Sequence, residues 1–298
     1  MFGCAPSPGA LAAAARKAAG FLAPALAAIT RHLIAAEVAH FDETGFRAAG
    51  RLAWVHSASA GKFALFTVHA KRGKDGMKAA GVLPDFRGIA VHDAWAPYDT
   101  FGNVAGHALC GAHVLRELVA VTETGTGPDR TWAQQAIDAL VTLNEAAEAA
   151  RAAGRDAIDP ETRAKHEDWH RKAAEAGIAL SAARQGKLQQ KRHALATRMK
   201  DREDDYLRFA RDLRVPFSND LASYCTSCGG WRARGLLGVQ VVVVLVVSVW
   251  LVGLTFCRGT RGRPDVRWGL RRPERWWSPR RLTAFSVSAG AGRAWPGW

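Results

Sequence analysis

The chain has 298 residues, of which 48% are hydrophobic, so it can form one large domain or two smaller ones and is not disordered throughout. Its formal net charge of +14 favours an anionic partner, either nucleic acid or an acidic membrane surface. The positive charge is unevenly distributed along the chain. Twelve arginines and only two acidic residues follow Ala222, so this last quarter carries +10, whereas residues 1–222 carry +4. Most of the charge that suggests nucleic-acid binding therefore lies in the last quarter.

The cysteines and the N-terminus favour a reducing compartment. The five cysteines are odd in number and scattered, unlike a secreted disulfide framework. The N-terminal stretch is rich in alanine, but Arg16 and Lys17 interrupt its apolar run, whereas a signal peptide carries its charge before that run. We therefore expect a cytoplasmic protein.

The first part of the chain predicts a lead-in followed by strands. Residues 1–36 form an Ala-rich lead-in that we expect to be partly helical or disordered. Three strands with glycines in or near their connections then predict an antiparallel meander, at residues 41–44, 51–59 and 62–69. A fourth strand, at residues 88–93, is short and apolar enough to be buried on both faces.

Helices dominate from about Tyr98 onward. Residues 108–119 predict a first helix, and apolar side chains at Trp132, Ala136, Leu140, Leu143 and Ala147 predict an amphipathic second one. Two long polar helices follow, at residues 160–184 and 187–213. We interpret this region, about 128–213, as a helical insertion in a domain that spans residues 37–222.

Two of the predicted strands carry an aspartate near their end. The first stretch reads HFDETG with Asp42, and the second reads GIAVHDAWAPY with Asp93. Two buried strands that each end in a carboxylate suggest a two-metal site, which needs a third acid. Glu43 should point to the opposite side of the strand from Asp42, so we interpret it as structural. His92, beside Asp93, is expected to orient a ligand, contact DNA or pack in the core.

The composition changes abruptly at about Ser223. Every later basic residue is arginine, and seven of the eleven tryptophans lie in this tail. Residues 239–256 form an apolar run with nine valines. The tail, residues 223–298, is typical of an out-of-frame translation of a GC-rich gene. The alternative is a transmembrane helix at 239–256 with an Arg-rich flank.

Several strings of residues resemble the catalytic domain of the bacterial insertion-sequence family sixty-six transposases. They occur in the family's order and cover residues 40–222, reading HFDETGFRAAGRLAWVHSAS, VHAKRG, GVLPDFRGIAVHDAWAPY, HALCGAHVLREL and RVPFSNDLA. The resemblance implies an α/β fold with a ribonuclease-H-like core, a mixed sheet and a helical insertion. It also implies an Asp, Asp, Glu triad that binds Mg²⁺ or Mn²⁺ and cuts and rejoins DNA ends.

The resemblance assigns roles to individual residues. Asp42 and Asp93 would be the first two catalytic acids and metal ligands. The third should be a Glu directly after the family's Asn, Asn, x, Ala pattern. Here that pattern reads Ser218 to Ala222 and is followed by Ser223, so the expected acid is absent. Asp220 is a weak substitute, because it lies three residues early, nearly one helical turn away.

Other candidate site residues have competing interpretations. Cys110 and His113 form a C-x-x-H pair that resembles a motif of related transposase families. Zinc binding would need two more ligands, such as Cys225 and Cys228, and the alternative is a role in helix packing. Three basic residues are candidate phosphate contacts or a solvated surface, namely Lys71, Arg72 and Lys74.

These features predict a transposase remnant that is truncated or inactive. Its partner would be DNA at transposon ends, with self-association or a mixed oligomer with an intact transposase, no small-molecule substrate, and a cytoplasmic, nucleoid-associated location. The alternative is a non-catalytic DNA-binding or regulatory protein. A third hypothesis is a membrane-anchored protein through residues 239–256.

Overall fold

The computed structural model describes residues 7–48, 50–182, 185–219 and 245–246. These residues belong to a unit that spans Met1–Leu251, and a second unit, Val252–Trp298, lies outside the described residues. The predicted apolar run at 239–256 also lies outside them, except for Leu245–Val246.

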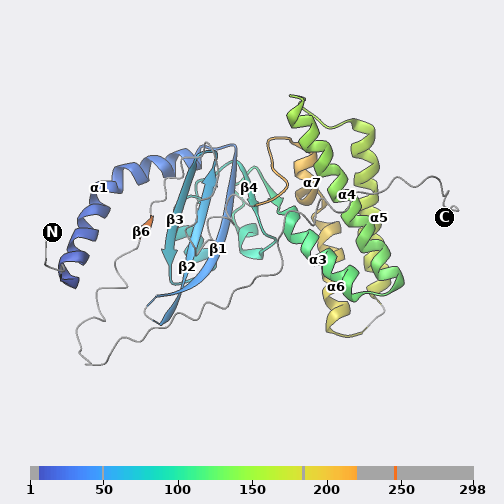
Figure 1. The fold of residues 1–298 in the computed structure, drawn as a ribbon, viewed down its shortest axis with the longest axis horizontal. Coiled ribbons are helices and arrows are strands. Elements are labelled where there is room, and N and C mark those ends of the chain that lie inside the picture. Colours follow the sequence, from blue (N-terminus) through green and yellow to red (C-terminus); the bar gives the residue numbers. More distant parts are fainter. Residues whose placement is uncertain (1–6, 49, 183–184, 220–244, 247–298) are drawn as a thin grey trace, which may run out of the picture. The chain divides into compact units, whose positions relative to one another are not determined.

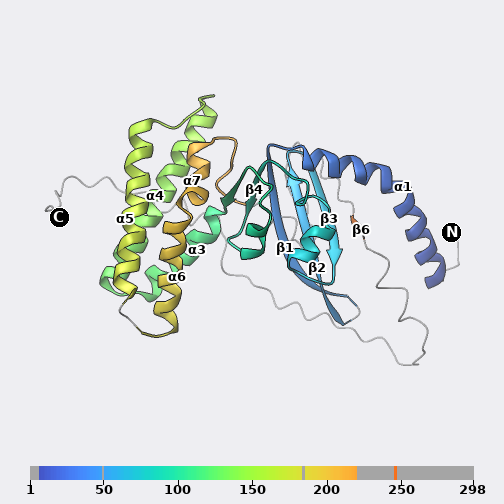
Figure 2. The same cartoon turned by 180° about the vertical axis from the view of Figure 1, so that it is seen from behind.

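The strands form one mixed sheet. Strands β1 (Val38–Ala48), β2 (Arg51–Ala60) and β3 (Phe63–His69) pair antiparallel and lie side by side in Figures 1 and 2, which confirms the predicted meander. Strands β4 (Ile89–His92), β5 (Gly106–Leu109) and β6 (Leu245–Val246) pair parallel with β1, β4 and β3, so the order is β5-β4-β1-β2-β3-β6. The predicted α/β class with a mixed sheet is confirmed.

Strand β1 is longer than predicted, so the expectation that Asp42 lies near its end was wrong. The strand runs on to Ala48 because Thr44 and Gly45 pair with Val55 and Trp54 of β2 instead of forming a turn. Gly45 packs under the ring of Trp54; a Cβ atom added at this position would lie 3.4 Å from that ring. The turn comes at Gly50, whose φ of +78° is a conformation that glycine adopts without strain.

The predicted lead-in is a helix over most of its length. Helix α1 (Pro8–Ile34) begins at Ser7, whose Oγ accepts a hydrogen bond from the N–H of Ala10 at 3.1 Å, and it is bent in Figure 1, with Pro24 in its interior. By length and composition, Gly9–Ile34 is the one described helical segment that is apolar enough to cross a membrane. A signal sequence meets the same criterion, so this finding alone does not assign α1 to a membrane.

Short helices connect the strands, and longer ones follow. The short ones are α2 (Lys74–Ala79) and the 3₁₀ helix η1 (Ala96–Thr100). The longer ones are α3 (Gly111–Thr124), α4 (Gly127–Ala152), α5 (Pro160–Ala182), α6 (Lys187–Asp201) and α7 (Glu203–Arg211). Helices α4 and α6 both pack against α5, and the predicted apolar stripe of α4 is fully buried.

The single helix predicted at residues 187–213 is two helices. Arg202 separates α6 from α7 with φ −116° and ψ 32°, outside the helical region, and its guanidinium pairs with Asp99 and Asp205. No glycine or proline marks the break, so the sequence pattern missed it.

Strand β1 separates two hydrophobic cores. One core contains Ala39 and Phe41 of β1 together with Ile29 and Leu33 of α1. The other contains Ile89 and Val91 of β4 together with side chains of α3 to α7. Because successive residues of a strand point to opposite faces, neighbouring residues of β1 and β4 serve different cores.

A buried ion pair joins two helices of the helical part. Arg192 of α6 donates from Nη1 to Asp129 Oδ2 of α4 at 2.8 Å, and from Nη2 to Thr124 Oγ1 at 3.1 Å. The side chains of Arg192 and Asp129 are only 4% and 2% exposed. Removing one member of such a pair leaves a buried charge without its counter-ion.

Asp129→Ala should lower the free energy of unfolding by about 3–5 kcal/mol, measured by urea denaturation. The matched control is Asp75→Ala, which removes the exposed partner of Lys71 and should change stability far less, because an exposed ion pair contributes little. Equal losses in the two variants would contradict the assignment of Asp129 as a buried structural charge.

His170 of α5 is fully buried, and among the described residues neither ring nitrogen has a hydrogen-bond partner. Burial lowers the pKa of His170 to about 4, while the carboxylate of Glu203 opposes this and the guanidinium groups of Arg171 and Arg211 reinforce it. Between about pH 6.5 and pH 4, His170 is therefore protonated in the unfolded chain but neutral in the folded chain. This contribution to stability is present above pH 6.5 and is lost as the pH falls to 4.

His170→Leu should lose this acid-dependent fall in stability, which is on the order of 3 kcal/mol between pH 7 and pH 4. Urea denaturation at the two pH values measures it. His193→Leu is the control, because His193 has a partner in Ser181 and its loss should leave the fall in place. A fall that is the same in His170→Leu and in the parent would refute the prediction.

Candidate functional site

The two predicted catalytic aspartates lie on strand β1 and directly after the neighbouring parallel strand β4. Asp42 is in the middle of β1, and Asp93 directly follows β4. His40 pairs with Val91 in the parallel register, so two residues further along each strand the positions of Asp42 and Asp93 correspond. The structure therefore brings together two residues that are far apart in the sequence.

The environment of Asp93 is partly buried. Burial raises the pKa of Asp93, and the negative charge of Asp42 raises it further. A hydrogen bond from the N–H of Trp95 to Asp93 Oδ1, at 3.1 Å, and the charge of His113 act in the opposite direction. An electrostatic effect of one aspartate on the other is the behaviour expected of two carboxylates that share one site.

Asp93 opens into a cleft of about 310 Å³. The cleft is also lined by Arg72, Trp95, Cys110, His113 and Arg198. Strand ends, the start of α3, and helices α6 and α7 all contribute to it. This volume can admit a few atoms of a substrate beside the carboxylate of Asp93.

Glu43 lies on the other side of β1 from Asp42, as its place in the strand predicts. Its carboxylate accepts hydrogen bonds from Tyr98 Oη at 2.6 Å and from Arg72 Nε and Nη2 at 3.1 and 3.0 Å. Burial raises the pKa of Glu43 to about 7, against the lowering effect of the Tyr98 hydrogen bond. Glu43 holds these two side chains in place beside the cleft.

The three basic candidates occupy different environments. The Arg72 guanidinium is bound to Glu43 and lies over the rings of Trp95 and Trp54, at 3.9 and 5.1 Å from their centroids. Lys71 and Lys74 are exposed, and Lys71 pairs with Asp75 at 2.9 Å. Lys71 and Lys74 are thus at the surface, whereas Arg72 is part of the wall of the cleft.

Cys110 and His113 lie at the start of α3. Cys110 precedes the helix and is 3% exposed, and its Sγ accepts the backbone N–H of Asn219 at 3.2 Å. The Nδ1 atom of His113 is buried and has no hydrogen-bond partner among the described residues. Cys225 and Cys228, which were considered as further zinc ligands, lie outside the described residues.

Asn219 connects the last described residues before position 220 to strand β1; it lies within the Ser218 to Ala222 pattern, but the sequence assigned it no role. Its Nδ2 donates to the carbonyl of Phe41 at 2.8 Å, and its Oδ1 accepts a hydrogen bond from His40 Nδ1 at 3.0 Å. Asn219 is 1% exposed, and its two contacts are with the two residues that precede Asp42. Asp220 and Ser223 lie outside the described residues.

The aspartate pair supplies the ligand chemistry that Mg²⁺ or Mn²⁺ prefers, because both are carboxylates. In the part of the chain that the structure describes, no third His, Cys, Asp or Glu forms a compact ligand group with Asp42 and Asp93. The described residues therefore fit a divalent cation with two of the three acids that the triad requires.

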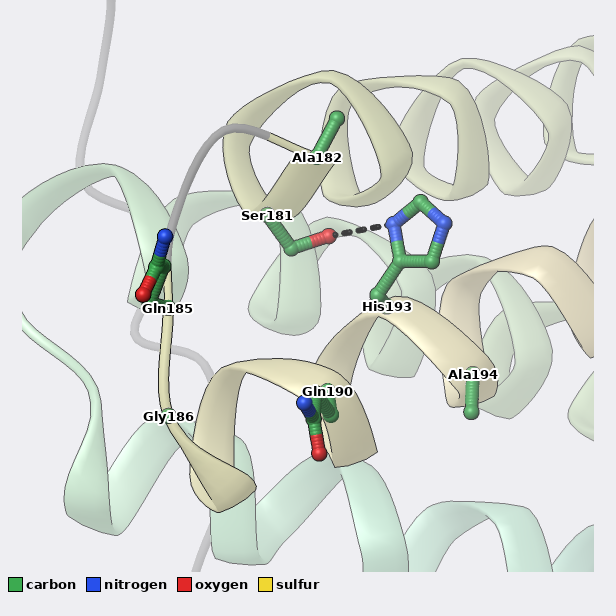
Figure 3. Close-up of a pocket in the computed structure, with 7 residues that line it drawn as sticks. All are labelled: Ser181, Ala182, Gln185, Gly186, Gln190, His193 and Ala194. Carbon is green, nitrogen blue, oxygen red and sulfur yellow. Dashed lines mark hydrogen bonds between the residues drawn. The ribbon is translucent and has the colours of Figure 1, made fainter.

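A second hollow, of about 400 Å³, lies between α5 and α6, away from the aspartates. Figure 3 shows Ser181 and His193 facing each other across it, with Ser181 Oγ 3.0 Å from His193 Nδ1. Ser181 Oγ also donates to the carbonyl of Gly177 at 2.5 Å. The hydroxyl thus helps to hold the end of α5 against α6, and among the residues that line the hollow it has no acidic third partner of the kind a catalytic triad uses.

Asn219→Ala should lower the free energy of unfolding by about 1–3 kcal/mol, because it removes two buried hydrogen bonds, to the Phe41 carbonyl and with the His40 ring. Thermal or urea denaturation measures the change. Asn144→Ala is the matched control, since the Oδ1 of this half-buried asparagine has no partner among the described residues. A loss in Asn219→Ala no larger than that in the control would show that Asn219 does not anchor this segment.

Comparison with known proteins identifies the family. The model of a family described as Transposase IS66 family matches residues 1–222, which is about three quarters of the chain. The match begins earlier than the resemblance noted from the strings, so it includes α1, and it ends at the residue after which the composition changes. A search of curated proteins finds no match. With Asp42 on β1, Asp93 directly after the neighbouring parallel strand β4, and this match over residues 1–222, the chain belongs to the IS66 family of transposases.

Proposed function

We propose that residues 1–222 are the catalytic region of an insertion-sequence transposase with a ribonuclease-H-like core, and that this copy has lost catalytic activity. The established family implies transposition and, in general, the use of a divalent metal. The observation that best supports the proposal is the parallel register of β1 and β4, whose last pair is His40 and Val91, two residues before Asp42 and Asp93.

Asp42 and Asp93 would hold the metal through their carboxylate oxygens. When bound, Mg²⁺ or Mn²⁺ supplies activation of the attacking water or 3′-hydroxyl and stabilisation of the leaving oxygen. The protein contributes the placement of the two carboxylates and the cleft beside Asp93. Arg72, held by Glu43 and the two tryptophans, gives this wall of the cleft a fixed positive charge that suits a phosphate.

The third acid is the missing element of the site. Asn219 ties its segment to β1 beside Asp42, so an acid one helical turn later would lie close to the aspartate pair if the helix of the family continued there. Position 223 is serine, and both the family match and the ordinary composition end at residue 222. We interpret the tail as a frameshift, in which case the nucleotide sequence read in another frame after codon 222 encodes a Glu followed by a basic helix.

Binding to transposon ends is the function that would remain. Lys71 and Lys74 lie at the surface next to Arg72 and are the proposed phosphate contacts. A copy that keeps its fold but lacks one acid could act as a non-catalytic DNA-binding or regulatory protein, alone or in a mixed oligomer with an intact transposase.

The test uses the purified full-length chain, duplex DNA that carries the ends of its element, and Mg²⁺ or Mn²⁺. We expect an end-specific gel shift that weakens with salt, and neither nicking nor joining of strands. Replacing Lys71 and Lys74 by alanine should weaken binding at low salt, whereas the same replacement of Lys172 in α5, an exposed lysine that also pairs with an aspartate, should not.

Robust cleavage by the unaltered chain that disappears in Asp42→Asn would show that the copy is active and that the third acid is supplied from elsewhere. Binding that does not distinguish the element's ends from unrelated DNA would count against the role at transposon ends.

A further inference from the structure

Three side chains that the proposed reaction does not use converge on one point beside β4. They are His92 at the end of β4, Asp99 in η1 and His107 in β5. One potential ligand atom of each lies within 4.8 Å of the other two. Neither Asp42 nor Asp93 belongs to this group, so it is separate from the pair of carboxylates.

The two histidines are oriented as metal ligands usually are. The Nδ1 atom of His92 lies against the backbone carbonyl of Asp93, where it can only donate, so its Nε2 carries a lone pair. That lone pair faces His107 Nδ1 at a distance of 2.9 Å. A metal-binding histidine commonly donates its other N–H to a carbonyl or carboxylate, which fixes the ring and the tautomer.

The ring of His92 is also held mechanically. It is 0% exposed and stacks on Tyr98, with ring centroids 4.2 Å apart and an angle of 18° between the planes. Tyr98 in turn donates to Glu43. The first nitrogen ligand is therefore fixed by packing before any ion arrives, which reduces the entropy lost on binding.

The carboxylate of Asp99 is the accessible member of the group. It is 45% exposed, and the guanidinium of Arg202 bonds both of its oxygens, at 3.3 and 3.0 Å. On the other side, Arg208 Nε donates to the carbonyl of His107 at 2.6 Å. Arg202 and Arg208 each pair with Asp205, so the two arginines and two aspartates around the histidines balance in charge. The partly exposed side of Asp99 leaves room for an ion to enter and for a water to complete its shell.

We propose that His92, Asp99 and His107 form a three-ligand site for a transition-metal ion of the Zn²⁺ class. Two imidazole nitrogens and one carboxylate suit Zn²⁺ or Co²⁺ and not Mg²⁺, which prefers oxygen ligands. Two nitrogens bound at about 2.0–2.1 Å in tetrahedral geometry would be about 3.4 Å apart, so the rings need to separate by only a few tenths of an ångström. Binding replaces the proton on His107 Nδ1 that the two nitrogens share, and neutral His107 keeps that proton by moving it to Nε2, so only its tautomer changes.

The site would connect β4, η1 and β5 next to Asp93. The hydrogen bond from His92 Nδ1 reaches the carbonyl of Asp93 itself, so an ion on Nε2 would hold the main chain that carries the second aspartate. This role is positional and does not depend on whether this copy cleaves DNA.

The experiment uses the full chain with Cys225→Ser and Cys228→Ser, which removes a C-x-x-C pair that could bind zinc on its own. The chain is stripped with a chelator and titrated with ZnCl₂, and bound metal is counted by elemental analysis. Titration with Co²⁺ reports the ligand set through its visible absorption. We expect one Zn²⁺ per chain and a rise in melting temperature.

His107→Ala should weaken Zn²⁺ binding by about 100-fold or more, and Asp99→Asn by about 10-fold or more. The matched control is His69→Ala, a half-buried strand histidine outside the group, which should bind as the parent does. Circular dichroism checks folding, and Asp99→Asn decides the question if His107→Ala does not fold. Failure of the parent to bind one Zn²⁺, equal binding by Asp99→Asn and the parent, or loss of binding in His113→Ala with His107→Ala unaffected would overturn the proposal.

Discussion

The requirement that strand β1 serve two cores at once governs the rest of this structure. Ala39 and Phe41 must point toward α1, and His40 and Asp42 toward the opposite face. A shift of one residue in the pairing register of β1 would turn each of its side chains to the opposite face of the sheet. This alternation is why Asp42 lies on the side of Asp93, which follows β4, while its neighbour Glu43 makes its hydrogen bonds with Arg72 and Tyr98.

Two buried polar side chains hold the main chain next to the two aspartates. Asn219 binds the main chain of Phe41 just before Asp42, and His92 binds the main chain of Asp93. Both bonds involve buried side chains, so each holds the backbone that carries an aspartate. The positions of the two aspartates thus depend on Asn219 and His92, which are not themselves proposed to contact DNA or the catalytic metal. The proposed zinc-class site at His92, Asp99 and His107 would fix the main chain at Asp93 further.

The sequence predicted features that depend on neighbouring residues better than contacts between residues that are distant in the chain. The motifs around Asp42 and Asp93, the meander and the stripe of α4 depend on short spacings, and the structure agrees with the meander and the stripe. The predicted end of β1 was wrong because Thr44 and Gly45, which favour a turn in isolation, pair with β2 in the folded chain. The break at Arg202 and the contacts of Asn219, Glu43 and His107 involve partners distant in the sequence, which no local pattern encodes.

The most direct test of the central claim is Mn²⁺ binding followed by electron paramagnetic resonance, since Mn²⁺ prefers the same oxygen ligands as Mg²⁺. We expect weak binding to the unaltered chain that both Asp42→Asn and Asp93→Asn abolish, and tighter binding in Ser223→Glu, which restores a third acid. Binding that survives both aspartate replacements would contradict the assignment of these two carboxylates as the metal site of this transposase.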